Sequence, residues 1–168
     1  MGGKIKIIAV GGTIDKVYFD DKSLYQVGKP TISNILSQAG VTLKYEVDSI
    51  LHKDSLDMTA DDRKLVANKV AEDKASKIVI THGTDTMVKT AKRVKKALVE
   101  GKLRKTVVFT GSMTPAMFKG SDAEFNVGGA IAAVQCLPVG VYIVMSGKVF
   151  EADTVVKNVE KGRFEKIK

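Results

Sequence analysis

Apolar, β-branched residues form short continuous runs along this chain. Four such runs cover residues 5–10, 78–81, 106–110 and 141–145, and residues 43–50 alternate between apolar and polar side chains. Continuous apolar runs are typical of parallel strands that are buried on both faces. They therefore predict the strands of a mainly parallel central sheet.

Segments with helical periodicity lie between these runs. We expect helices over residues 31–39, from the N-cap Thr59 onward, over 85–100, and over a small-residue stretch ending near Cys136. The helix after Thr59 is expected to bury Leu65, Val66 and Val70. Cys136 is predicted to be a small, buried apolar residue on the last of these helices. Residues 11–30 and 111–126 are predicted as long loops, and residues 148–151 as the return strand of a hairpin. Alternation of strands and helices predicts a three-layer α/β/α fold, which we expect to form one domain over 1–168.

The chain is basic, with a formal net charge of +8. Part of this charge comes from basic residues within 87–98. In this segment, apolar side chains at four positions mark one helix face: Met87, Ala91, Val94 and Leu98. The basic residues of the same segment fall on the opposite face, which indicates a solvated surface. No aromatic residues interleave with them, so binding of nucleic acid is not expected. A general attraction for anionic substrates remains.

Other functional classes are disfavoured by composition. Cys136 is the only cysteine, which excludes an internal disulfide and a cysteine-rich metal site. The two histidines, His52 and His82, form no evident ligand set, so no metal or other cofactor is expected. No apolar run is long enough to span a membrane. These features predict a cytoplasmic protein.

Two hydroxyl-rich turns directly follow predicted strands. They are Gly11-Gly12-Thr13-Ile14 and Thr81-His82-Gly83-Thr84-Asp85-Thr86. Ligands of open α/β sheets bind beyond the carboxyl ends of the strands, so Thr13 and Thr84 can face one crevice. This arrangement suits attack of one threonine on a carbonyl carbon, with the other turn supplying a base or donors. The alternative for the second turn is purely structural, with Asp85 placed favourably at a helix N-terminus.

These turns, together with Asp54-Ser55-Leu56-Asp57-Met58-Thr59 and Thr110-Gly111-Ser112-Met113, closely resemble the bacterial-type L-asparaginase family. The resemblance covers essentially the whole chain and corresponds to the N-terminal domain of that family. It implies hydrolysis of asparagine, or of a related small amide, to aspartate and ammonia without a cofactor. It also implies a homodimer or a higher homo-oligomer.

The resemblance further implies a catalytic set, carried over position by position. Thr13 matches the nucleophile, and Tyr25 lies at the spacing of the tyrosine that assists it. Thr84 and Asp85 match the second catalytic group, and Lys157 falls where the family places its catalytic lysine. A surface lysine is the competing interpretation for Lys157.

A substrate-binding set is implied in the same way. Ser55 matches the serine that binds the substrate α-carboxylate, and the backbones of Gly12 and Gly83 are expected to approach the substrate closely. Leu56 stands where many members have a glutamine that contacts the substrate.

A second departure concerns the family's smaller second domain, which supplies a glutamate that binds the substrate amino group. We expect this domain to be absent, which predicts weak activity unless another acid, with Asp122 and Glu124 as candidates, takes its place. Three interpretations therefore remain: a minimal amidohydrolase, a non-catalytic module that binds an amino acid or a partner, and an amide-handling subunit of a larger assembly.

Overall fold

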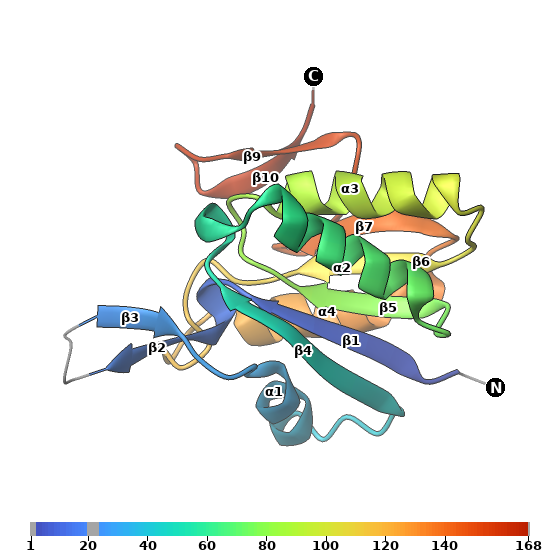
Figure 1. Cartoon of the computed structure of the whole chain (residues 1–168). Helices are drawn as coiled ribbons and strands as arrows, with labels where there is room; N and C mark the ends of the chain where they lie inside the picture. Colours follow the sequence, from blue (N-terminus) through green and yellow to red (C-terminus); the bar gives the residue numbers. More distant parts are fainter. Residues whose placement is uncertain (1–2, 20–23, 168) are drawn as a thin grey trace.

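The structure, a computed structural model, describes residues 3–19 and 24–167 as one α/β unit (Figure 1). Its strands are β1 (Ile5–Gly11), β2 (Lys16–Phe19), β3 (Leu24–Val27), β4 (Tyr45–Lys53), β5 (Lys77–Thr81), β6 (Thr106–Thr110), β7 (Gly140–Met145), β8 (Lys148–Glu151), β9 (Val155–Asn158) and β10 (Arg163–Lys166). Its helices are η1 (Thr13–Asp15), α1 (Ile32–Gln38), η3 (Ser55–Asp57), α2 (Ala60–Glu72), α3 (Met87–Glu100) and α4 (Ala123–Cys136).

Six strands form the central sheet in the order β4-β1-β5-β6-β7-β8. The first five are parallel to one another, and only β8 runs antiparallel, as the return strand of the predicted hairpin. One face packs against α2 and α3, and the other packs against α1 and α4. The predicted three-layer fold with a mainly parallel sheet is therefore confirmed.

Local signals place the helix ends where the sequence predicts them. Thr59 caps α2 in a capping box, because its side chain accepts from the Asp62 N–H while the Asp62 carboxylate accepts from the Thr59 N–H. Gly40, with a φ of 62°, follows the end of α1 in the left-handed conformation that glycine adopts easily. These features define the start of α2 and the end of α1.

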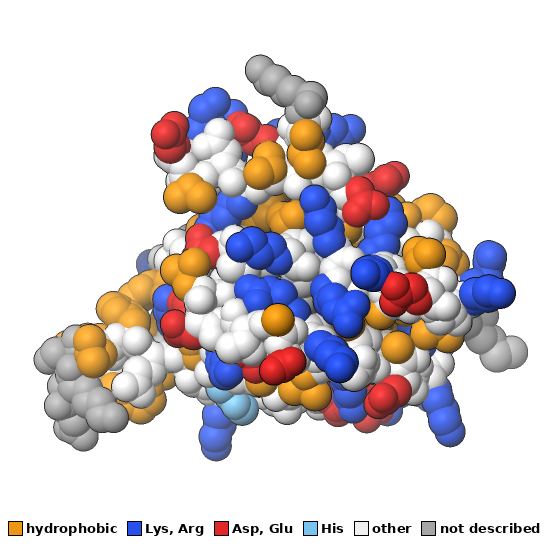
Figure 2. All heavy atoms as spheres, turned by 45° about the horizontal axis from the view of Figure 1, so that its top comes forward, with side chains coloured by type: hydrophobic (Ala, Val, Ile, Leu, Met, Phe, Trp, Pro, Cys, Tyr) orange, Lys and Arg blue, Asp and Glu red, His pale blue; other side chains and the backbone are white. Residues whose placement is uncertain are grey.

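The basic helix face is also confirmed. The four apolar positions predicted on α3 are buried, whereas Lys89, Lys92 and Lys96 are exposed. Figure 2 looks onto this side of the molecule, where Lys and Arg side chains are numerous. Two of the α3 lysines pair with acids, Lys95 with Asp153 and Lys96 with Glu100. The face is a solvated surface with local charge compensation.

Two predictions about single side chains are wrong. Leu65 is 47% exposed, because successive helix residues point about 100° apart and α2 turns Val66 and Val70 toward the sheet instead. Cys136 is exposed, because it is the last residue of α4 and lies beyond the part of the helix that covers the sheet.

One prediction about a segment needs correction as well. Residues 11–30 are not one long loop, since β2 and β3 form an antiparallel hairpin in which Tyr18 lies opposite Tyr25. Its tip, residues 20–23, lies outside the described residues. A second unpredicted pair, β9 and β10, packs against α3 through Val155 and Phe164, which join the core. This pair matters for the site because β9 carries Lys157.

Candidate functional site

Three backbone turns meet at the carboxyl ends of β1, β5 and β6. A Cβ atom on Gly12 would lie 2.3 Å from the Gly83 Cα, and one on Gly111 would lie 2.3 Å from the His82 carbonyl oxygen. Gly12 also has a φ of 92°, which side chains rarely permit. Glycine is therefore required for these turns to touch, and their contact brings the two threonine-bearing turns together.

Thr13 begins η1 directly after this contact. The Gly12 N–H donates to the Lys53 carbonyl at 2.9 Å, and the Asp15 N–H donates to the Gly12 carbonyl at 3.1 Å. Both bonds fix the backbone on either side of Thr13, which remains partly exposed. Thr13, the candidate nucleophile, thus lies on an ordered turn and is partly accessible to solvent.

Lys157 reaches the second turn from β9. Its Nζ donates to the Thr84 Oγ1 at 2.7 Å and to the Asp85 Oδ1 at 2.6 Å. The Lys157 side chain is only 12% exposed, and Thr84 is buried. The structure therefore joins these three residues into one hydrogen-bonded cluster, although Lys157 lies more than 70 positions from Thr84 and Asp85 in sequence.

Ser55 packs behind the same turn. A Cβ on Gly83 would lie 2.6 Å from the Ser55 Cβ, and the Thr86 hydroxyl donates to the Ser55 carbonyl at 2.7 Å. Ser55 is 1% exposed, whereas the neighbouring Leu56 is 71% exposed. Ser55 is thus a fixed part of the turn cluster, and the Leu56 side chain points into solvent.

Tyr25 is less closely tied to the cluster. It is half exposed on β3, in the hairpin that projects from the body in Figure 1. Its ring packs against Tyr18 and against Phe118, with centroids 5.3 and 5.9 Å away. Within the described residues, no hydrogen bond joins Tyr25 to Thr13.

Asp122, one of the two acids considered for binding a substrate amino group, is already engaged. Its carboxylate accepts hydrogen bonds from the N–H groups of Met113 and Thr114 and from the Asn126 side chain. These bonds hold the loop after β6 against α4. Asp122 therefore acts as a structural anchor, while Glu124 is exposed in the first turn of α4.

Sequence reasoning missed Asp15, which anchors the foot of the β2–β3 hairpin. Its Oδ1 accepts from the N–H and the hydroxyl of Thr31, both at 2.8 Å, and its carbonyl accepts from the Gly28 N–H. Burial raises the pKa of this carboxyl, although the bonds from Thr31 oppose the shift. An acid two positions after Thr13, separated only by Lys16 from the apolar and aromatic residues 17–19, is the sequence signal that could have revealed this anchor.

His82 was also missed, since the sequence assigned it no role beyond the turn motif. Its ring is completely buried, with Nδ1 2.7 Å from the Gly83 carbonyl oxygen and Nε2 2.8 Å from the Thr90 Oγ1. Because a carbonyl oxygen only accepts, Nδ1 carries the proton and Nε2 accepts from the Thr90 hydroxyl. Burial lowers the pKa of His82 to about 4, so the ring is neutral at physiological pH.

This shift predicts a loss of stability on acidification. The unfolded chain takes up a proton near the ordinary pKa of 6.5, whereas folded His82 does so only near 4. The stabilisation is therefore complete above pH 6.5 and declines as the pH falls toward 4, by about 3 kcal/mol in total. Asp15, whose pKa is raised, titrates with the opposite sign and reduces the net slope.

Urea unfolding at a series of pH values measures this effect. We expect the free energy of unfolding to fall more steeply between pH 6.5 and 4.5 in the parent chain than in a His82→Asn variant, which cannot titrate at this position. Parallel curves for the two proteins would show that His82 is not responsible.

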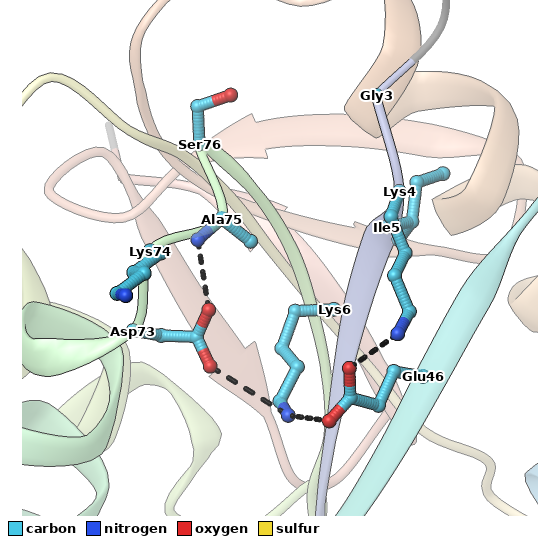
Figure 3. A pocket seen from close by; sticks show the side chains of 9 residues that line it. All are labelled: Gly3, Lys4, Ile5, Lys6, Glu46, Asp73, Lys74, Ala75 and Ser76. Carbon is cyan, nitrogen blue, oxygen red and sulfur yellow. Dashed lines mark hydrogen bonds and ion pairs between the residues drawn. The ribbon is translucent and has the colours of Figure 1, made fainter.

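A separate cavity of about 380 Å³ lies at the amino end of the sheet, between β1 and the segment before β5 (Figure 3). The buried Lys6 borders it and pairs with Glu46 at 2.9 Å and with Asp48 at 2.8 Å. Burial lowers the pKa of Lys6, but the bonds to Asp48 and Glu46 outweigh it and leave the pKa raised. These paired charges hold strand ends together and lie away from the threonine turns.

Two further structural observations concern metal binding and membrane crossing. Among the described residues, no cluster of three His, Cys, Asp or Glu side chains has the geometry to hold a metal ion. In the same part of the chain, every helix is too short or too polar to cross a bilayer.

Comparisons with known proteins confirm the resemblance predicted from the motifs. Residues 4–164 match the family described as "Asparaginase, N-terminal". The chain is 32% identical to L-asparaginase 2 of Escherichia coli over 165 residues, covering 91% of this chain and 46% of the relative. It is 26% identical to the glutaminase-asparaginase of Acinetobacter glutaminasificans over 171 residues, covering 92% of this chain and 50% of that relative.

A solved structure gives the same result. The thermostable L-asparaginase from Thermococcus kodakarensis superposes with a TM-score of 0.81 at 28% identity, covering 98% of this chain and 51% of that one. The chain thus spans about half the length of the relatives that it matches.

Proposed function

This chain belongs to the asparaginase family, and on that premise we propose that it hydrolyses a small amino-acid amide, with asparagine as the first candidate. The observation that carries the proposal is the Lys157–Thr84–Asp85 cluster beside the Thr13 turn. The same fold without such a cluster would support membership of the family but not catalysis.

In the proposed reaction, the Thr13 hydroxyl attacks the amide carbon and forms an ester with it. The carbon–nitrogen bond breaks, and the leaving nitrogen departs as ammonia after taking up the proton that the hydroxyl lost. Water then attacks the ester, and the acid product leaves. Both attacks need a group that accepts a proton, since hydroxyls and water are weak nucleophiles.

The Lys157–Thr84–Asp85 cluster is proposed to handle these protons. Lys157 donates to the oxygen of Thr84, which leaves the Thr84 proton free to bond toward the substrate. Asp85 holds the lysine in place through its second contact. Tyr25, carried by the hairpin anchored at Asp15, is proposed to approach Thr13 when substrate is bound.

Ammonia release from asparagine, glutamine and their D-forms tests the proposed function. We expect slow but measurable release from L-asparagine. Binding of the amino acid without any release would instead support a non-catalytic binding module.

Ser55 is proposed to bind the substrate carboxylate, which gives a separate prediction. A Ser55→Ala change should raise KM about ten- to a hundredfold, the equivalent of one charge-assisted hydrogen bond of about 1.5–3 kcal/mol. The value of kcat should change by less than about threefold, because Ser55 does not touch the reacting bond. Steady-state kinetics measures both, and Ser37→Ala, an exposed serine on α1, serves as the control. A fall in kcat at unchanged KM would contradict this role.

We also propose that the chain self-associates, as the family resemblance implies. Exposed apolar side chains on the β9–β10 pair and at the chain end after it, including Val156, Val159 and Ile167, support this proposal. Light scattering would measure the oligomeric state.

A further inference from the structure

His82 lies directly behind the turn that carries Thr84, and its ring is held at both nitrogens. Nδ1 donates to the Gly83 carbonyl at 2.7 Å, while the Thr90 hydroxyl on α3 donates to Nε2 at 2.8 Å. The ring also packs edge-on against Phe109 of β6, with centroids 6.0 Å apart. A side chain fixed by α3, β6 and the turn itself can hold the turn in one orientation.

The bond to Gly83 determines where the next N–H group points. A trans peptide is planar, so the C=O of Gly83 and the N–H of Thr84 point in opposite directions. Because His82 holds the C=O on the buried side, the Thr84 N–H faces away from the ring. Gly83 has little freedom to rotate, since Gly12 and Ser55 fill the space around its Cα.

The Thr84 N–H has no acceptor among residues 3–19 and 24–167. Buried backbone N–H groups are nearly always paired, and Thr84 is only 4% exposed. An unpaired donor next to the Thr13 turn is therefore free to bind an oxygen atom of a ligand.

We propose that His82 is a positioning residue that, through its hydrogen bond to the Gly83 carbonyl, directs the Thr84 N–H at the carbonyl oxygen of the scissile amide. This inference rests on the proposed amide hydrolysis. When Thr13 attacks, the carbonyl oxygen gains negative charge, and a fixed N–H donor stabilises that charge. The stabilisation grows in the transition state, so it acts on kcat more than on KM.

Three variants separate positioning from general support of the fold. His82→Leu fills the space but removes both hydrogen bonds. His82→Asn keeps an N–H donor near the position of Nδ1. Thr90→Val removes the donor to Nε2 while leaving the Nδ1 bond possible. Melting temperatures of all three identify any loss of folding.

We expect His82→Leu to lower kcat about ten- to a hundredfold with KM changed less than about threefold, since removal of one such donor costs up to about a hundred- to a thousandfold. His82→Asn should restore kcat to within about fivefold of the parent, and Thr90→Val should lower it by less than His82→Leu does. Unchanged kcat in His82→Leu, or equal losses in the Leu and Asn variants, would overturn the proposal.

Nitrogen-15 NMR provides a readout that does not depend on turnover. The parent should show His82 protonated at Nδ1, and addition of L-aspartate should shift the Thr84 amide resonance more in the parent than in His82→Leu. Protonation at Nε2, or equal shifts in the two proteins, would overturn the positioning role. A parent chain that gives these NMR results but releases no ammonia would instead contradict the proposed hydrolysis alone.

Discussion

Replacing Thr13 with alanine is expected to lower the rate of ammonia release by about a thousandfold or more. The change removes the hydroxyl that is proposed to form the ester, and no other group on the same turn offers a nucleophile. The backbone should be little disturbed, because the bonds of Gly12 and Asp15 that fix the turn do not involve the Thr13 side chain. Steady-state ammonia release at saturating asparagine measures the loss.

Two control variants make this result specific. Thr13→Ser keeps a hydroxyl and should retain much more activity than Thr13→Ala. Thr42→Ala, at an exposed position between α1 and β4, should behave like the parent chain. Activity of Thr13→Ala close to that of the parent would rule out Thr13 as the nucleophile.

Replacing Lys157 with methionine should have a comparable effect. Methionine occupies a similar volume but cannot donate to Thr84 or Asp85, so it separates the proton-handling cluster into unconnected parts. We expect kcat to fall by about a thousandfold, with Thr84→Val causing a similar loss. Rates measured at saturating substrate would show both effects.

A nearby lysine provides the matched comparison. Lys161 belongs to the same β9–β10 hairpin and is exposed, with its ammonium 3.9 Å from Glu165. Exposed pairs of this kind contribute little, so Lys161→Met should leave kcat within about twofold of the parent. Equal losses in the two lysine variants would indicate a general charge effect instead of a role for Lys157 in the cluster.

The central layers of the fold could be predicted because their signals are local. Continuous apolar runs identified β1, β5, β6 and β7, and the Thr59 cap identified the start of α2. The hairpin of β2 and β3 was missed although its strands contain aromatic and β-branched residues, because each strand has only four residues. Such short segments acquire their structure from cross-strand pairs that a single sequence does not display.

In the candidate site, too, some residues could be proposed from the local sequence, whereas other contacts depend on tertiary packing. Thr13, Thr84 and Asp85 could be proposed from turns that directly follow predicted strands. The contact of Lys157 with Thr84 and Asp85 could not be derived from local pattern, because it depends on how Val155 and Phe164 dock the β9–β10 pair onto the core. His82 and Asp15 were overlooked because their roles consist of buried hydrogen bonds to backbone groups.

Quenched-flow mass spectrometry of the chain mixed with L-asparagine tests the central claim most directly. We predict a transient aspartyl ester on the peptide that contains Thr13, with ammonia appearing before free aspartate. We also expect the ester to be absent from Thr13→Ala. Formation of the ester on Thr84, or undiminished turnover by Thr13→Ala, would contradict the proposed mechanism.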